Sequence, residues 1–304
     1  MTLCQRVECV PNISEGRDAD VVRDVAQAAR VDGVALLGVD SDPDHHRTVI
    51  SFAGSVEAVA RAAFALAKQA VKRIDLNTHR GAHPRMGSLD VLPFVPLQGT
   101  TMDDCVALAR QVGERIAREL RVPVYLYGEA AVRPERRNLA AVRRGQFEGL
   151  TEKIKHPQWA PDFGDPVPHP TAGATAVGAR APLIAFNVNL DTEDLDLARQ
   201  IAKKVRYSSG GLPCVKALGF ALPQRACVQV SMNMTDYERT GLHEAFGLIE
   251  QEAARAGVGV LGSEIVGLTP QRALLDSAQF YLKLNGFSQG QILEHVLAEA
   301  ERDG

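Results

Sequence analysis

Residues 183–206 of this chain read LIAFNVNLDTEDLDLARQIAKKVR, which joins a strand-like stretch directly to a helix-like stretch. The apolar run over 183–190 predicts a strand, and residues 192–206 predict a helix. The alternation continues beyond them, with expected strands over 215–222, 227–234 and 258–266 and expected helices over 236–256 and 270–284. The order β-α-β-β-α-β, with a helix added at its end, is the split βαβ pattern.

The first half of the chain shows the same order of elements. Its expected strands are 5–10, 34–39, 47–52, 89–97 and 124–127, and its expected helices are 18–30, 56–74, 101–121 and 134–144. Pro93 and Pro96 favour an edge position for 89–97, because proline cannot donate a ladder hydrogen bond. The repeated order indicates an internal duplication of one βαββαβ unit and an α+β fold.

The composition is that of a globular protein with a real core. Of 304 residues, 45% are hydrophobic and 23% are charged, and the net charge is −3. The sequence has no long basic run of the kind that would predict a nucleic-acid partner. It also has no apolar run long enough to predict a membrane span. The five cysteines show no C-x-x-C spacing, which favours reduced thiols and a cytoplasmic location.

The loop expected over residues 78–87, THRGAHPRMG, holds two histidines and two arginines. His83 precedes Pro84, so its backbone is pushed out of the helical region, and Gly81 and Gly87 permit tight bends on either side. One titratable ring beside fixed positive charge suits general acid/base chemistry on an anionic substrate. The alternative interpretation is a basic, solvated surface loop.

Three other motifs match known functional patterns, but their surroundings in the sequence do not fit those functions. Residues 257–262, GVGVLG, match a dinucleotide fingerprint but enter a strand instead of leaving one, and 286–290, GFSQG, follow a helix-like stretch where a nucleophile elbow needs a strand. Residues 40–51 resemble a calcium loop but lack its glycine and its final glutamate. A divalent metal site is retained as a minor alternative, with Asp42, Asp44, His45 and His46 as its ligands.

Residues 156–178 are rich in proline and glycine and predict a long, ordered, irregular connection. This segment and many others carry motifs that resemble one family. The matching motifs are VECVPNISEG (7–16), HPRMG (83–87) with LDV (89–91), PVYLYGEAA (123–131), WAPDFG (159–164), GAT (173–175), GAR (178–180), AFN (185–187), GS (262–263), VGL (266–268) and ALLD (273–276). They resemble glutamate formiminotransferases from about residue 5 to about residue 285.

The resemblance implies an enzyme that moves the formimino group of N-formimino-L-glutamate to tetrahydrofolate in histidine breakdown. Tetrahydrofolate would be the co-substrate, and no metal, nucleic acid or membrane partner is expected. The resemblance also implies a homodimer whose protomers hold two tandem ferredoxin-like subdomains, here 1–178 and 179–304, with mixed or antiparallel sheets. A cyclodeaminase domain follows in the animal enzyme, and this chain is expected to be a stand-alone transferase.

The family's catalytic histidine corresponds to His83, and its aspartate before the Arg-Thr-Val strand resembles Asp40. His83 would move the proton that one amine loses and the other gains, and Asp40 would orient the imidazole or favour a cationic formimino group. Arg47 and Arg85 are candidates for binding substrate carboxylates. Asn12 and Asn187 are candidates for hydrogen bonds to the pterin, with turn residues at strand ends as the alternative. The family's folate-contacting loop corresponds to Gly164, Asp165, Pro166, Val167, Pro168, His169, Pro170, Thr171, Ala172 and Gly173.

The chain departs from the family pattern at three places. It has Ala82 where the family usually has glutamate, His46 where it usually has asparagine, and a different sequence over 165–172. These departures keep N-formylglutamate open as an alternative donor. Two further alternatives are a catalytically silent folate-binding protein and a metal hydrolase built on the turn with Asp42 and His45.

Overall fold

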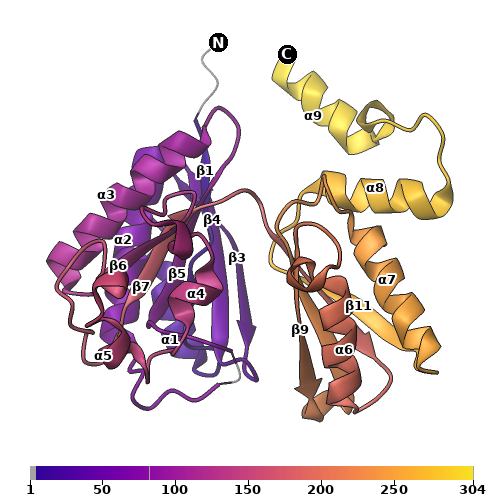
Figure 1. Ribbon diagram of the computed structural model, residues 1–304. Coiled ribbons are helices and arrows are strands. Elements are labelled where there is room, and N and C mark those ends of the chain that lie inside the picture. Colours follow the sequence, from indigo (N-terminus) through magenta and orange to yellow (C-terminus); the bar gives the residue numbers. More distant parts are fainter. Residues whose placement is uncertain (1–4, 82, 304) are drawn as a thin grey trace. The chain divides into compact units, whose positions relative to one another are not determined.

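The computed structural model describes residues 5–81 and 83–303, so Cys4 and Ala82 lie outside the described residues. The chain divides into two compact units between Pro182 and Leu183 (Figure 1). The first unit holds a mixed sheet and the second an antiparallel sheet, each with helices, which confirms the α+β class. Within the described residues, no helix is long and apolar enough to cross a membrane.

The sheet of the first unit extends a βαββαβ unit by two parallel strands. Its order is β3-β4, then β1 and β2 in line, then β5-β7-β6, and only the pairings of β7 with β5 and β6 are parallel. The elements are β1 (Val7–Cys9), β2 (Asn12–Ile13), α1 (Ala19–Gln27), β3 (Val34–Asp42), β4 (Arg47–Gly54), α2 (Val56–Arg73), β5 (Leu89–Pro96), α3 (Met102–Leu120), β6 (Val124–Gly128), α4 (Leu139–Arg143), α5 (Leu150–Lys153) and β7 (Thr175–Ala179).

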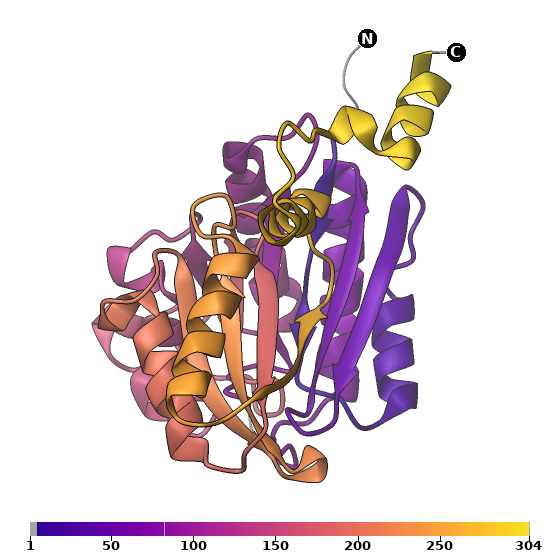
Figure 2. The same ribbon diagram turned by 90° about the vertical axis from the view of Figure 1, so that its right-hand side faces the viewer.

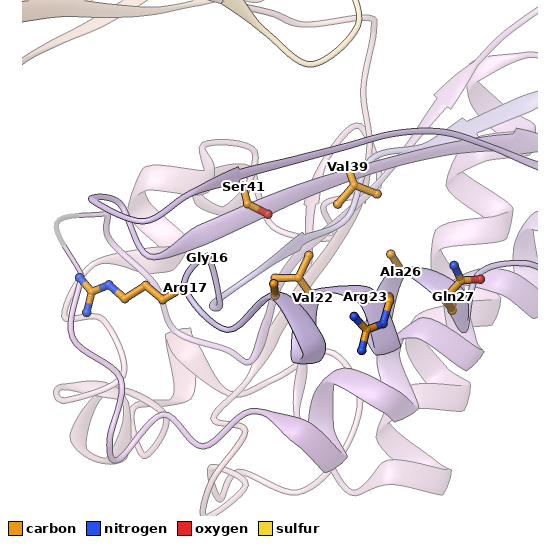
Figure 3. Close-up of a pocket in the computed structure, with 9 residues that line it drawn as sticks. Gly16, Arg17, Val22, Arg23, Ala26, Gln27, Val39 and Ser41 are labelled. Atoms are coloured by element: carbon orange, nitrogen blue, oxygen red, sulfur yellow. The ribbon is translucent and has the colours of Figure 1, made fainter.

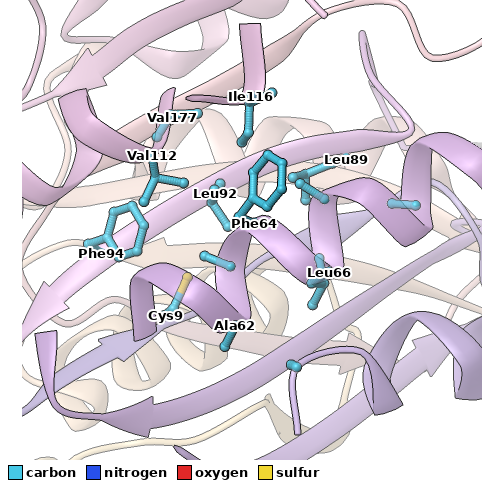
Figure 4. Close-up of a cluster of buried hydrophobic side chains, with 14 of the residues drawn as sticks. Cys9, Ala62, Phe64, Leu66, Leu89, Leu92, Phe94, Val112, Ile116 and Val177 are labelled. Atoms are coloured by element: carbon cyan, nitrogen blue, oxygen red, sulfur yellow. The ribbon is translucent and has the colours of Figure 1, made fainter. Parts of the chain in front are cut away.

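The main core of this unit lies between the sheet and helices α1, α2 and α3. Small alanines on α2 let it approach the strands, and Phe64 packs near Leu92 and Ile116 (Figure 4). Side chains fix where the two long helices begin: the Ser55 hydroxyl accepts from the Ala58 N–H, and the capping box of α3 starts at Thr101. On the opposite face of the sheet, α4 and α5 pack against Val91, Tyr125 and Tyr127 in a smaller cluster.

The second unit has a four-stranded sheet in the order β11-β8-β10-β9, and every pairing is antiparallel. Figure 2 shows α6 and α7 on the same side of this sheet, where their apolar faces bury the strand side chains. The elements are β8 (Ile184–Leu190), α6 (Leu195–Val205), β9 (Val215–Leu222), β10 (Cys227–Met234), α7 (Leu242–Arg255), β11 (Val260–Val266), α8 (Gln271–Leu282) and α9 (Leu293–Asp303). The order from β8 to β11 is the predicted β-α-β-β-α-β.

Strand β5 lies inside the sheet, so the edge position expected from its prolines is wrong. Val10 lies opposite Pro93, and Pro11 lies opposite Leu92. At these two residues the neighbouring strand is interrupted between β1 and β2. The Val10 N–H still donates to the Pro93 carbonyl at 3.2 Å. The missing proline N–H is therefore accommodated by an interruption in the neighbouring strand instead of by an open edge.

Candidate active site

The loop that follows α2 places His83 beside the β3–β4 turn. A Cβ atom on Gly81 would come within 2.5 Å of the His45 carbonyl oxygen and 2.6 Å of the His46 Cβ, so only glycine fits this approach. The loop and the turn border a narrow recess that their own side chains nearly fill. The recess is lined by Ile13, Ser14, His45, His46, Arg47, His79, His83, Arg85 and Asp90.

The His83 ring is held as a neutral imidazole. Arg47 Nη1 donates a hydrogen bond to His83 Nε2, so the other ring nitrogen carries the proton. Burial, followed by the positive charges of Arg47 and Arg143, holds the pKa of His83 well below its ordinary value. A neutral ring with one basic nitrogen is the form that a general base requires.

Arg47 is the cation that contacts this ring. Burial and the nearby Arg143 lower the pKa of Arg47 to about 9, and its buried Nε atom has no hydrogen-bond partner. Such an unsatisfied donor is costly unless an acceptor arrives, and a substrate carboxylate would supply one. The carboxylate-binding role of Arg47 stays a prediction, and the unpartnered Nε atom is the group it would use.

Two residues beside Arg47 were missed from the sequence. Asp90 on β5 accepts from the Met86 N–H at 2.9 Å, and its other oxygen lies 2.6 Å from Arg143 on α4. A carboxylate inside the otherwise apolar 89–97 run was the signal that could have identified Asp90, because buried charges need partners. Arg143 gave no such signal, since it sits in a helix of ordinary composition.

Arg85 is occupied by protein partners. Its guanidinium pairs with both carboxylate oxygens of Glu148 at 2.7 and 2.8 Å, its Nε donates to His79 Nδ1 at 3.1 Å, and it is 6% exposed. Further bonds run to Gln146 Oε1 and the His79 carbonyl. The expected role of Arg85 as a substrate clamp therefore requires these bonds to break, and its observed role is to anchor the loop.

Asp40 and Asn12 lie on the same sheet face, with Val49 between them. Asp40 on β3 and Asn12 on β2 both pair with Val49 of β4, and Arg47 is two residues away from it on the same face. Asp40 is exposed, and the ring of His83 is contacted by Arg47 and by the Pro84 backbone. The contacts described for the imidazole do not include Asp40, so its predicted role in orienting the ring stays a prediction, as does its role toward a cationic substrate group.

The segment expected to contact folate begins and ends on glycines with left-handed backbone, Gly164 (φ 88°) and Gly173 (φ 66°). Its far end joins the loop of His83, because Gly173 bridges Gly87 and the Ala174 N–H donates to the Met86 carbonyl at 3.0 Å. The segment continues into β7, which the sequence did not predict. Its exposed residues are Gly164, Asp165, Pro166, Val167 and Pro170, and its other members, Pro168, His169, Thr171, Ala172 and Gly173, are half-buried or buried.

Asn187 belongs to the second unit, on β8. Its Nδ2 atom donates to Glu264 Oε1 at 3.3 Å, while its buried Oδ1 atom has no partner. Gln229 also donates to Glu264, at 2.9 Å, and leaves its own Oε1 atom unsatisfied. These two amides form a polar patch on the sheet face opposite α6 and α7, a location that suits a hydrogen-bonding ligand.

A larger groove of about 320 Å³ lies between α1 and the edge strand β3 (Figure 3). It is lined by Gly16, Arg17, Ala19, Val22, Arg23, Ala26, Gln27, Val39 and Ser41. Because it holds no carboxylate, imidazole or thiol, it offers no group for proton transfer. The recess with His83 is therefore the better candidate for chemistry.

The alternative metal site is not formed within the described part of the chain. No group of three or more histidine, cysteine, aspartate or glutamate side chains there is arranged to hold a metal ion. Asp42 instead accepts from the backbone N–H of His45 at 2.8 Å and contacts His45 Nδ1 at 2.8 Å. The His45 ring in turn lies edge-on to His83, with 6.3 Å between ring centroids.

Comparison with known proteins places these residues in a family. The model for the N-terminal subdomain of the formiminotransferase domain matches residues 6–180, and the model for the formiminotransferase domain matches residues 185–296. The chain is 51% identical to a glutamate formimidoyltransferase of Streptococcus pyogenes, over 96% of this chain and 98% of that protein. It is also 51% identical to a glutamate formimidoyltransferase of Thermoplasma acidophilum, over 97% and 98% of the two chains.

A formimidoyltransferase-cyclodeaminase of Sus scrofa is 46% identical over 92% of this chain and 53% of its own length. The chain thus spans about half of that longer relative. Both family models and the relatives agree over nearly all of the described residues. The chain belongs to the formiminotransferase family.

Proposed function

We propose that this chain is a glutamate formimidoyltransferase, which transfers the formimino group of N-formimino-L-glutamate to tetrahydrofolate and yields 5-formiminotetrahydrofolate and L-glutamate. The observation that carries the proposal is a neutral His83 whose basic nitrogen faces Arg47, in a chain 51% identical to glutamate formimidoyltransferases. Transfer between two amines needs a base for the incoming nitrogen, and an anionic donor needs a cation beside that base.

His83 is the proposed proton carrier. Its Nε2 atom accepts the proton that the attacking nitrogen of tetrahydrofolate loses, and it returns that proton to the nitrogen of the departing glutamate. Burial, followed by the charges of Arg47 and Arg143, lowers the pKa of His83 and disfavours the imidazolium that this step forms. A substrate carboxylate beside Arg47 would offset the charge part of this effect and so raise the pKa of His83. Binding of the donor would thereby make His83 a stronger base.

The remaining residues have binding roles in this proposal. Arg47 binds a carboxylate of the glutamate moiety through its unpartnered Nε atom. Asp40, exposed on the same sheet face, favours the cationic form of the formimino group. Asn12, Asn187 and the segment from Gly164 to Gly173 contact the folate, with tetrahydrofolate acting as a co-substrate. The expected homodimer is a proposal that sedimentation of the purified protein tests.

A donor comparison tests the function. Purified protein is incubated with tetrahydrofolate and either N-formimino-L-glutamate or N-formyl-L-glutamate, and release of glutamate is measured. The proposal predicts fast release from the formimino donor and slow or no release from the formyl donor. Preference for the formyl donor would support the alternative transferase, and release from neither donor would support a folate-binding protein without activity. Loss of activity with a chelator would support a metal enzyme.

A further inference from the structure

Two histidines stack beside the proposed base without being part of it. His46 ends the β3–β4 turn and His79 lies in the loop after α2, and their rings are nearly parallel, at 9° and 4.1 Å between centroids. His46 also has a left-handed backbone, with φ 50°, which is uncommon for a residue other than glycine. A strained position that is kept in place by several contacts suggests a specific task for the side chain.

The hydrogen-bond partners of the His46 ring indicate its protonation state. Its Nδ1 atom lies 2.9 Å from the Arg80 carbonyl oxygen, and its Nε2 atom lies 3.0 Å from Glu15 Oε1. Burial opposes ionisation of Glu15, yet N–H groups of Asp18 and Arg17 and the contact with His46 hold its pKa below the ordinary value. Both ring nitrogens of His46 therefore face acceptors, and both must donate. The ring is an imidazolium.

The partner ring is neutral by the same reasoning. His79 Nδ1 accepts from Arg85 Nε, since a guanidinium can only donate, and His79 Nε2 lies 2.9 Å from the His46 carbonyl oxygen. Burial, which outweighs the bond to the His46 backbone, lowers the pKa of His79. A charged ring thus stacks on a neutral one, and the two are flanked by the carboxylate of Glu15 and the guanidinium of Arg85.

This arrangement fixes the distance between the proposed base and its cation. His46 bonds to Arg80 in the loop and to Glu15, which is itself held by the N–H groups of Gly16, Arg17 and Asp18 at 2.8 to 3.0 Å. Arg47 follows His46 directly, and His83 lies three residues after Arg80. The doubly bonded ring therefore ties the segment that carries Arg47 to the segment that carries His83.

We infer that His46 is a positioning residue, whose imidazolium form holds the loop of His83 against the turn of Arg47. The catalytic step that His46 would assist is the one in the proposed function, so this part of the inference rests on that function. The charge state of the ring does not depend on the proposed function. The His46 ring contacts Glu15 ahead of α1 and the Arg80 carbonyl and His79 ring in the loop. The other charged or titratable groups nearby are its chain neighbours His45 and Arg47, and Arg85, which contacts His79. Loss of the ring leaves both acceptors without this bridge and loosens the loop, so kcat falls.

The test combines a spectrum with steady-state kinetics. Nitrogen NMR of the purified protein at neutral pH, assigned with the His46→Asn variant, should show both ring nitrogens of His46 protonated. In the assay, His46→Asn, which cannot bridge both acceptors, should lower kcat about 3- to 10-fold with KM changed less than twofold. Glu15→Gln, which removes the charge that faces His46 Nε2, should lower kcat in the same direction, again with little change in KM.

His156→Asn is the matched control, since His156 is exposed and distant in sequence from the loop and the turn. It should behave like wild type in both experiments. A ring of His46 with one protonated nitrogen would overturn the inference whatever the activity. A kcat that stays at the wild-type value in both Glu15→Gln and His46→Asn would also overturn it. Absence of any transferase activity in wild type would instead contradict the proposed function, and the NMR result would still decide the charge of His46.

Discussion

Arg47 Nη1 donates a hydrogen bond to Nε2 of His83, although the two residues are 36 positions apart in the sequence. The bond occupies the lone pair that would accept a substrate proton, so the ring is neutral and its basic nitrogen is engaged by Arg47. A guanidinium that can exchange this bond for one to a carboxylate would couple donor binding to the availability of the base.

Replacement of His83 by alanine should reduce kcat by about 10²- to 10⁴-fold, the usual contribution of a general base. The affinity for tetrahydrofolate should change less than threefold, because the proposed folate contacts lie elsewhere. Steady-state kinetics and quenching of the single tryptophan by folate measure the two effects. Turnover that stays within a few-fold of wild type would remove His83 from the mechanism.

Replacement of Arg47 by glutamine should raise KM for the donor by about 10-fold or more, as expected for a lost charge-assisted bond to a carboxylate. It also removes a charge that lowers the pKa of His83, so that pKa rises. A base that is active when neutral is lost as pH falls through its pKa. The acid side of the kcat/KM profile should therefore move to higher pH. Arg47→Lys, which keeps the charge, should leave that side near its wild-type position, and an unmoved profile in Arg47→Gln contradicts the account.

Replacement of Asp40 by asparagine tests the remaining role of that carboxylate. We expect kcat to fall about 10-fold, with little change in melting temperature, because Asp40 is exposed on the edge strand β3. Kinetics with the formimino donor and a thermal melt provide the comparison. Unchanged kcat would exclude Asp40 from stabilising a cationic substrate group.

Replacement of Gly81 by alanine should displace the His83 loop. The new methyl group would meet the His45 carbonyl oxygen at 2.5 Å, and the forced shift should cost about 1–3 kcal/mol and lower kcat. Gly247→Ala is the control, because a Cβ atom there meets nothing within 4 Å and α7 gains a better helix former. We expect the melting temperature to fall for the first variant and to rise for the second. Equal, wild-type activity in both would show that the loop tolerates the shift.

Glu148 should make stability depend on acid pH. Hydrogen bonds from Arg85 lower the pKa of Glu148 to about 2, below the ordinary value of 4.5. Because the folded pKa is the lower one, this contribution is complete above pH 4.5 and is lost as pH falls toward 2. Glu148→Gln should therefore be less stable than wild type at pH 7, with a smaller difference at pH 3, in urea unfolding. The exposed Glu114→Gln on α3 is the control, and a difference that does not shrink in acid would be inconsistent with the pairing.

Local sequence signals were enough for most of the fold. Apolar periodicity and capping residues identified α1, α2, α3, α6 and the strands of both βαββαβ units. Strand β7 was missed because its sequence, TAVGA, is short and consists mainly of small residues, with only Thr175 and Val177 β-branched, between proline-rich and glycine-rich flanks. It forms because the neighbouring strands β5 and β6 supply its partners. Such a strand is determined by tertiary pairing, which a window of sequence does not contain.

The candidate site also has residues that the local sequence predicts and residues that only the packing of distant elements brings in. His83 and Arg47 were found because a histidine before proline and a basic strand start are visible locally. The partners that set their electrostatics, Arg143 and Asp90, come from other elements and reach the site only through packing. Arg85 was assigned a binding role because its engagement by Glu148, 63 positions later, has no local signature.

The central claim is most directly tested by following the transferred carbon. N-formimino-L-glutamate labelled with ¹³C in the formimino group is mixed with tetrahydrofolate and the purified protein, and the label is followed by NMR. The account predicts that the label appears on the folate as glutamate is released in equal amount, and that His83→Ala abolishes both signals. Label that remains on glutamate, or that appears as free formamide or formate without folate product, would contradict it.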